Sequence, residues 1–286
     1  MPRPVRRTIT RMSEILWTAS ELSAALESPR PPVLLDVRWA LGDTEGHRKY
    51  VDAHVPGAVY VDLPTELAGQ GESTDGRHPL PDIADLQAHA RRWGIDDEST
   101  VVVYDATGNL AAARAWWLLR WAGLSTVRLL DGGLGAWTAA GGETRSGEET
   151  ALRAGTVTLS PGHLPTVSSD EVASFAGTVL DARAGERYRG EVEPIDPRAG
   201  HIPGAVSAPT SDNLTPDGVF ADPSALRNRF QALGIRPGDQ VAVYCGSGVT
   251  AAHQIAALAV AGVDATLYPG SWSAWSSDPD RPVETS

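Results

Sequence analysis

VAVYCGSGVTAAH, residues 241–253, contains the only cysteine of this 286-residue chain. A short apolar run leads into Cys245, two glycines follow it, and an alanine-rich helical pattern begins at Ala251. This order predicts a strand, a tight loop and a helix, with the thiol in the loop at the helix N-terminus. Backbone N–H groups and the helix dipole favour an anion there. The loop therefore indicates a thiolate nucleophile, and a buried structural cysteine is the alternative.

Composition limits the class of protein. A length of 286 residues favours two domains of ordinary size, and a net charge of −12 argues against a nucleic-acid or anionic-membrane partner. No apolar run is long enough to predict a membrane span. A single cysteine cannot form an internal disulfide, and residues 1–12 carry arginines without the apolar segment of a secretory signal. We therefore expect a cytoplasmic protein with a flexible N-terminal extension over residues 1–12.

Short apolar runs alternate with helical patterns through the first half of the chain. We expect strands at 33–38, 59–61, 100–104 and 127–130. A helix is expected to begin at 18–21, and others should cover 82–93 and 109–121, while 64–81 has the Gly, Pro and polar composition of a loop. Strands and helices alternating at this spacing predict an α/β fold with a parallel sheet flanked by helices.

The same order recurs in the second half. LDAR at 180–183 repeats LDVR at 35–38, HIPGA at 201–205 repeats HVPGA at 54–58, and Tyr244 corresponds to Tyr104. The nearly constant offset indicates a duplicated domain, with copies at 13–142 and 167–286 joined by a linker at 143–166. The alignment pairs Cys245 with Asp105, so only the second copy has the thiol. Because pockets favour domain interfaces, we expect a site shared between the copies.

These residues resemble the two-domain rhodanese-like sulfurtransferases over nearly the full chain. YVDAHVPGA at 50–58 is similar to the first-domain signature of the family, and CGSGVT at 245–250 resembles the active-site loop of its 3-mercaptopyruvate branch. The resemblance implies two tandem rhodanese-like domains, of which the second is catalytic. The thiosulfate branch carries Arg and Lys at the positions of Gly246 and Ser247. The implied sulfur donor is therefore 3-mercaptopyruvate, with thiosulfate as the alternative.

The resemblance also implies which residues bind the donor. The carboxylate of 3-mercaptopyruvate calls for an arginine fork. Arg187 matches the carboxylate-binding arginine of the family, and Arg198 lies near a second one; a surface arginine paired with a nearby glutamate is the alternative for each. Donor groups for the sulfur and the developing enolate would come from the loop. These loop residues are Gly246, Gly248, Val249 and Thr250.

A Ser–His–Asp set assists proton movement in the mercaptopyruvate enzymes. Ser247 matches its serine, while His78 and Asp62, both from the first half, resemble its other two members. A solvated histidine and a helix-capping aspartate are the alternatives for the latter two. If the set forms, the first half has a catalytic reason to be retained.

The implied reaction is a sulfur transfer through a Cys245 persulfide to a thiol or to cyanide. The thiol acceptor would be a thioredoxin-like protein or a low-molecular-weight thiol. We expect no metal and no cofactor, since the sequence has no metal-ligand spacing. A cysteine-based phosphatase is disfavoured, because the arginine it needs six positions after the cysteine is Ala251 here. A non-enzymatic sulfur carrier or binding module is the alternative from a different class.

Overall fold

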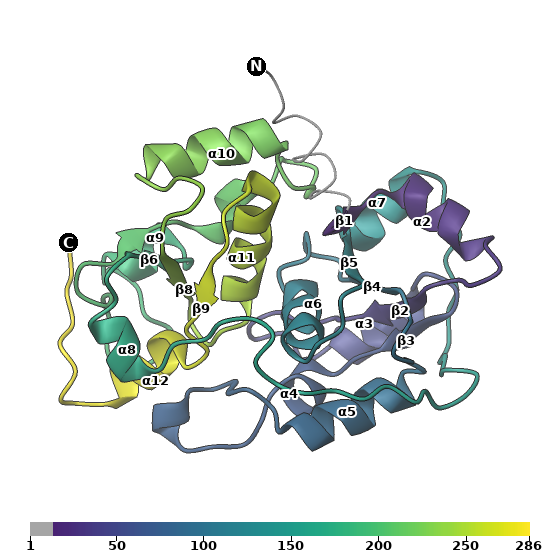
Figure 1. The fold of residues 1–286 in the computed structure, drawn as a ribbon, viewed down its shortest axis with the longest axis horizontal. Helices are drawn as coiled ribbons and strands as arrows, with labels where there is room; N and C mark the ends of the chain where they lie inside the picture. Colours follow the sequence, from purple (N-terminus) through teal and green to yellow (C-terminus); the bar gives the residue numbers. More distant parts are fainter. Residues whose placement is uncertain (1–13) are drawn as a thin grey trace.

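The computed structural model describes residues 14–286 as two α/β halves that lie side by side (Figure 1). The extension expected over residues 1–12 lies outside the described residues. The first half has a five-stranded parallel sheet in the order β1-β5-β4-β2-β3, and the second has a four-stranded parallel sheet in the order β7-β6-β8-β9. The strands are β1 (Leu16–Trp17), β2 (Val33–Asp36), β3 (Ala58–Tyr60), β4 (Val101–Tyr104), β5 (Val127–Leu130), β6 (Thr178–Asp181), β7 (Val206–Ser207), β8 (Val241–Tyr244) and β9 (Thr266–Leu267).

Helices connect the strands and flank both sheets, as the parallel pattern requires. In the first half they are α2 (Ala19–Leu26), α3 (Gly46–Asp52), α4 (Leu63–Glu66), the 3₁₀ turn η1 (Ser73–Asp75), α5 (Ile83–Arg92), α6 (Ala112–Trp121) and α7 (Gly133–Ala139). In the second half they are α8 (Ser169–Ala173), α9 (Gly185–Tyr188), the 3₁₀ turn η2 (Thr210–Asn213), α10 (Pro223–Ala232), α11 (Thr250–Ala261) and α12 (Ser271–Ser277).

The two halves have the same core topology, which confirms the duplicated α/β fold. In the first sheet Asp36 of β2 is in register with Tyr104 of β4, and in the second sheet Asp181 of β6 is in register with Tyr244 of β8. The helix expected to begin at 18–21 is α2, whose N-cap Thr18 forms a reciprocal capping box with Glu21.

Three local expectations need correction. The helix predicted over 109–121 begins only at Ala112, because Gly108 and Asn109 both take positive φ angles in a turn ahead of it. The segment 64–81 is not loop throughout, since α4 and η1 lie within or across it. Strand β1 was not predicted, because two residues are too few to show a strand period.

The segment between the sheets, 143–166, has no helix or named strand but packs along the first half. The N–H of Gly155 donates to the carbonyl of Arg91 at 2.7 Å, and that of Val157 donates to Ile95 at 3.1 Å. The side chains of Val157 and Leu159 are buried. The segment is therefore fixed along the first half, and its end at Pro165 and Thr166 pairs with β9 of the second half.

Helices α6 and α11 pack against each other at the centre of the molecule and form the junction between the halves (Figure 1). Both are almost entirely buried: α6 contributes Trp116 and Trp117, and α11 contributes a run of small apolar residues. Burial of this much apolar surface favours one fixed arrangement of the two halves. No helix among residues 14–286 is long and apolar enough to cross a bilayer.

Candidate active site

Cys245 directly follows β8, which is an interior strand of the second sheet, and it begins the loop that leads into α11. Its side chain is free, and the residue is only 2% exposed. The N–H of Gly248 donates to its Sγ atom at 3.2 Å. Gly248 has a φ of 78°, and a Cβ there would lie 2.5 Å from the carbonyl oxygen of Pro269. A glycine is therefore needed to turn this N–H toward the sulfur.

The equivalent loop of the first half shows what such a loop binds. Asp105 stands where Cys245 stands in the second half, and its buried carboxylate accepts four main-chain N–H groups at 2.7–3.1 Å. The donors are Thr107, Asn109, Ala111 and Ala112. The first half thus carries a built-in anion in its loop. In the second half the corresponding position holds a sulfur atom that can accept a transferred group.

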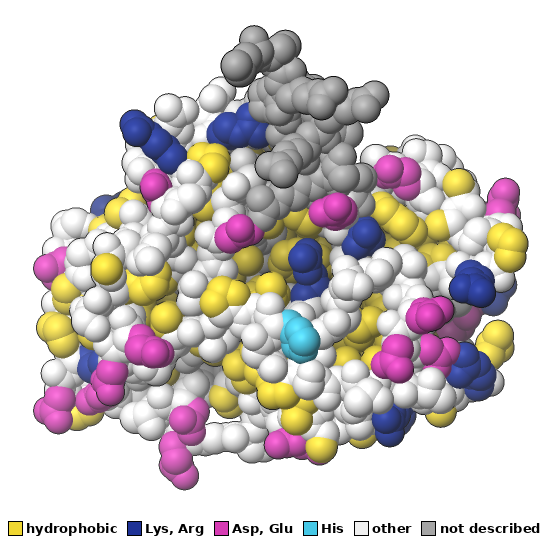
Figure 2. All heavy atoms as spheres, viewed as in Figure 1, with side chains coloured by type: hydrophobic (Ala, Val, Ile, Leu, Met, Phe, Trp, Pro, Cys, Tyr) yellow, Lys and Arg dark blue, Asp and Glu magenta, His cyan; other side chains and the backbone are white. Residues whose placement is uncertain are grey.

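A cavity of about 280 Å³ opens onto Cys245. The second half supplies Gly246, Ser247, Val249 and Thr250 from the loop, together with Arg183, Arg187, Thr210 and their neighbours. The first half supplies Trp39, Leu41, Arg77 and Leu110. Figure 2 shows one face of the molecule, on which acidic and basic side chains are interspersed. The cavity therefore lies between the halves, as expected for a shared site.

Ser247 and His78 meet across the junction, as the resemblance implied. The Nδ1 atom of His78 lies 2.8 Å from the Oγ atom of Ser247. Trp39 packs edge-on against the imidazole, with ring centroids 5.4 Å apart. Burial, followed by the positive charges of Arg114 and Arg77, lowers the pKa of His78 to about 4. The imidazole is therefore neutral at neutral pH and can exchange a proton with the serine hydroxyl.

The structure does not bring Asp62 to this pair, which corrects the expected three-residue set. Asp62 is the N-cap residue of α4, and its Oδ2 atom accepts a hydrogen bond from the Thr65 hydroxyl at 2.5 Å. Its side chain lines a separate surface cavity with Tyr60, Glu66 and others. The side chain is held at the start of α4 by Thr65, away from the later part of the same stretch that carries His78. Ser247 and His78 thus form a pair without this aspartate.

Arg187 lies at the cavity, as expected, and Arg77 joins it from the first half. A Cβ atom at Gly246 would lie 3.3 Å from Nη1 of Arg187 and 3.3 Å from Nη2 of Arg77. The two guanidinium groups therefore approach the same point above the cysteine loop. Arg77 was not among the predicted residues, although it directly precedes His78 in the sequence.

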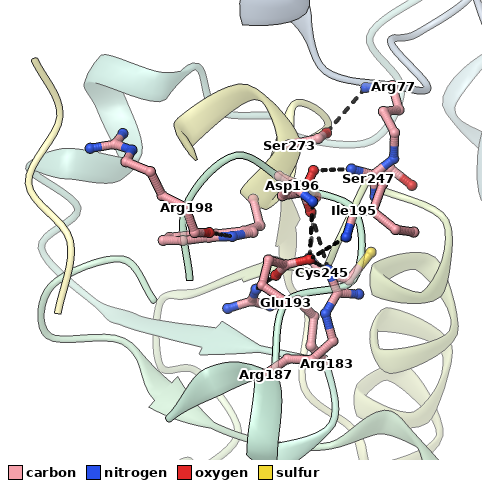
Figure 3. A network of polar contacts seen from close by, with 12 residues as sticks. Arg77, Arg183, Arg187, Glu193, Ile195, Asp196, Arg198, Cys245, Ser247 and Ser273 are labelled. Atoms are coloured by element: carbon pink, nitrogen blue, oxygen red, sulfur yellow. Dashed lines mark hydrogen bonds and ion pairs between the residues drawn. The ribbon is translucent and has the colours of Figure 1, made fainter. Parts of the chain in front are cut away.

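Two buried carboxylates stand behind these arginines (Figure 3). Glu193 accepts from Nη2 of Arg187 at 2.6 Å and from Nη1 of Arg183 at 3.3 Å. Asp196 accepts from Nη2 of Arg187 at 3.1 Å and also from Nη1 of Arg77. Asp196 therefore connects the arginine of the first half to that of the second.

Arg198 does not reach the cavity, which corrects its expected role in substrate binding. Its guanidinium donates to the main-chain carbonyls that end α12 and follow it, those of Trp275, Ser276, Asp278 and Arg281. Figure 3 shows the side chain directed away from Cys245. Arg198 satisfies carbonyl groups that a helix end leaves without partners. It is a structural residue of the second half.

Arg114 of α6 is a further residue that sequence reasoning did not assign to the site. Its guanidinium is fully buried and donates to the carbonyls of His78, Pro79, Leu67 and Gly248 at 2.9–3.3 Å. Within residues 14–286 these partners are all main-chain carbonyls, and no carboxylate is among them. One side chain of the first half thus holds both the histidine segment and the cysteine loop. The sequence gives one indication of this role, because Arg114 is a charged residue within the mostly apolar helix AARAWWLLRW.

The low pKa of His78 predicts a pH-dependent contribution to stability. The unfolded chain binds a proton on this histidine below about pH 6.5, whereas the folded protein does not until about pH 4. The contribution is thus complete above pH 6.5 and is lost as the pH falls toward 4. We expect the wild type to lose about 1–2 kcal/mol more unfolding free energy than His78→Gln between pH 7 and pH 4.5. Urea unfolding at both pH values measures this, and parallel losses in the two proteins would contradict it.

The fold and site together define a class of protein. A single thiol follows a sheet strand and accepts one loop N–H, two arginines approach its loop, and a neutral histidine contacts the loop serine. This arrangement is suited to nucleophilic chemistry on a small anion. No group of three or more His, Cys, Asp or Glu side chains that could hold a metal ion occurs within residues 14–286. The chain belongs to the rhodanese-like domain family, whose model matches residues 18–140 and 168–278.

Similar proteins carry two kinds of sulfurtransferase name. SseB of Mycobacterium tuberculosis, provisionally named a thiosulfate sulfurtransferase, is 48% identical over 94% of this chain and 96% of its own length. A Pseudomonas aeruginosa protein, provisionally named a 3-mercaptopyruvate sulfurtransferase, is 47% identical over 94% of this chain and 98% of its own. The solved structure of SseA, a 3-mercaptopyruvate enzyme of Escherichia coli, has a TM-score of 0.79 at 29% identity and covers 90% of this chain and 98% of its own.

Proposed function

We propose that this chain is a sulfurtransferase that moves sulfur from 3-mercaptopyruvate to an acceptor through a persulfide on Cys245. The observation that supports the proposal most strongly is the position of the Cys245 Sγ atom, which accepts a loop N–H. In the equivalent loop of the first half, four N–H groups bind the carboxylate of Asp105. A loop with inward-pointing N–H groups stabilises the negative charge of a thiolate and also that of the persulfide formed from it. Names of relatives from two bacterial species support sulfur transfer in general.

The first step transfers one sulfur atom to the enzyme. The Cys245 thiolate attacks the thiol sulfur of 3-mercaptopyruvate and forms an S–S bond. The C–S bond breaks, and its electron pair moves onto the pyruvate unit to give an enolate. The enolate takes up a proton and leaves as pyruvate. The Ser247 hydroxyl, 2.8 Å from neutral His78, is placed to supply that proton and to be reprotonated through the imidazole.

The second step restores the enzyme. A nucleophilic acceptor attacks the outer sulfur of the Cys245 persulfide, and the Cys245 thiolate leaves. The acceptor we propose is a thioredoxin-like protein or a low-molecular-weight thiol, with cyanide as an assay acceptor. Such thiols are kept reduced in the cytoplasm, where we place the protein. The proposed division of labour assigns catalysis to the copy at 167–286 and positioning to the copy at 13–142, joined by the segment 143–166.

The distribution of positive charge at the cavity supports 3-mercaptopyruvate over thiosulfate as the donor. The loop positions next to the thiol are Gly246 and Ser247, so the loop brings no cation of its own. Arg187 presents Nη1 to the loop at Gly246, while Glu193 and Asp196 hold its Nη2 atom, so it offers the carboxylate of the donor one charge-assisted hydrogen bond.

The test is a comparison of kcat/KM for 3-mercaptopyruvate and for thiosulfate, with the same acceptor, in the wild-type protein. We expect the value for 3-mercaptopyruvate to be higher by about tenfold or more, which corresponds to one charge-assisted hydrogen bond in the transition state. Arg187→Gln should raise KM for 3-mercaptopyruvate more than it lowers kcat, because the carboxylate is bound in both ground and transition states. A higher kcat/KM for thiosulfate would overturn the donor assignment.

A further inference from the structure

We propose that Arg77, from the half without the thiol, is the second anion-binding arginine of this site. We further propose that Asp196 and Glu193 aim Arg77 and Arg187 at the cavity and offset their charge, so that a donor with one negative charge is preferred to a dianion. The preference for 3-mercaptopyruvate as the donor rests on the proposed function. The binding of an anion by the two arginines rests only on where their side chains lie.

Two guanidinium groups converge above the cysteine loop. Nη1 of Arg187 and Nη2 of Arg77 each lie 3.3 Å from the point where a Cβ of Gly246 would stand. The second Nη atom of each arginine is engaged by a carboxylate on the other side. Each guanidinium therefore presents one terminal nitrogen to the cysteine loop. A carboxylate above Gly246 would be within reach of both.

The two buried acids hold the arginines in this orientation. An arginine side chain loses much rotamer freedom when it is fixed, so its direction must be set by other contacts. Asp196 receives a hydrogen bond from each of the two arginines and thus fixes their mutual position. Glu193 in turn accepts the N–H of Asp196 at 3.1 Å, which orders the turn that carries both acids. The segment 193–196 thus acts as a rigid support behind the two arginines (Figure 3).

The charges of these four side chains balance. Arg77 and Arg187 bring two positive charges, and Glu193 and Asp196 bring two negative ones. The carboxyl side chains are 4% and 2% exposed, so water screens them little. The remaining pair of the network, Arg183 with Asp181, is also balanced. A single carboxylate gains two hydrogen bonds at this site, whereas a dianion brings a second charge close to two buried acids.

The experiment uses two alkylating agents that differ in charge. Iodoacetate carries one carboxylate and iodoacetamide carries none, so the ratio of their rates at Cys245 reports anion binding without requiring sulfur transfer. We expect Arg77→Gln to lower this ratio about tenfold, as for the loss of one charge-assisted hydrogen bond, with the iodoacetamide rate little changed. Arg77→Lys keeps the charge and should recover part of the ratio. Arg92→Gln, which removes an exposed arginine of the same half, is the matched control and should leave the ratio unchanged.

Steady-state kinetics then test the specificity. Arg77→Gln should raise KM for 3-mercaptopyruvate about tenfold with kcat within about threefold of the wild type. Asp196→Asn should raise kcat/KM for thiosulfate relative to 3-mercaptopyruvate by about tenfold, since it removes one negative charge. An unchanged alkylation ratio in Arg77→Gln, or an unchanged donor ratio in Asp196→Asn, would overturn the inference. If Arg77→Gln lowers the alkylation ratio but the wild-type protein transfers no sulfur, the proposed function is overturned and the anion-binding role of Arg77 is kept.

Discussion

Replacement of Cys245 with serine is expected to lower kcat/KM at least about a thousandfold with either sulfur donor. A hydroxyl cannot accept the sulfur atom as a persulfide, and no other cysteine exists in the chain to replace it. The serine is close in size and can still accept the Gly248 N–H bond, so the fold should be retained. The measurement is steady-state activity together with a circular dichroism spectrum of the variant.

The matched control for this variant is Asp105→Asn, at the equivalent position of the first half. It perturbs the corresponding loop but leaves the thiol in place, and it is expected to reduce stability rather than chemistry. A Cys245→Ser protein that keeps more than a few per cent of wild-type activity would show that sulfur is carried by another group.

Replacement of Arg114 with methionine is expected to lower the unfolding free energy by about 3–5 kcal/mol. The change removes four hydrogen bonds at the junction, and of the four carbonyl groups that of Pro79 keeps a second donor, the N–H of Gly69. Burial lowers the pKa of Arg114 to about 10, with the charge of the Cys245 thiolate opposing this shift. The guanidinium therefore remains charged at neutral pH, and these are charge-assisted bonds.

The same variant should lose about tenfold or more in kcat, because the His78 and Gly248 segments lose their shared partner. Urea unfolding and steady-state kinetics measure the two effects. Arg198→Met is the matched control: it also removes an arginine that donates to four carbonyls, yet it lies away from the cavity. It should reduce stability while kcat stays near the wild-type value. An Arg114→Met protein with wild-type stability would contradict this account of the junction.

The cysteine loop and the duplication could be predicted from sequence because both are local patterns. An apolar run, two glycines and a helical period define the surroundings of Cys245 without knowledge of the rest of the fold. The match between the two halves then predicts two copies of one α/β unit. The contact between Ser247 and His78 could be inferred only through the family resemblance, since 168 residues lie between them in the sequence.

The direction of long side chains could not be predicted in the same way. Arg187 and Arg198 are close in sequence, yet one faces the cysteine loop and the other satisfies the end of α12. Asp62 and His78 both come from the segment after β3, yet they line different cavities. Such differences depend on which carbonyl or carboxylate lies within reach after the halves have packed. Arg77 and Arg114 acquire their roles only at the junction.

The most direct test of the central claim is the mass of the peptide that contains Cys245 after the wild-type protein is incubated with 3-mercaptopyruvate and no acceptor. The account predicts that this peptide gains the mass of one sulfur atom while pyruvate is released in equal amount. It also predicts that the added mass disappears when a thiol acceptor is supplied. Release of pyruvate with no added sulfur on Cys245 would contradict a persulfide intermediate.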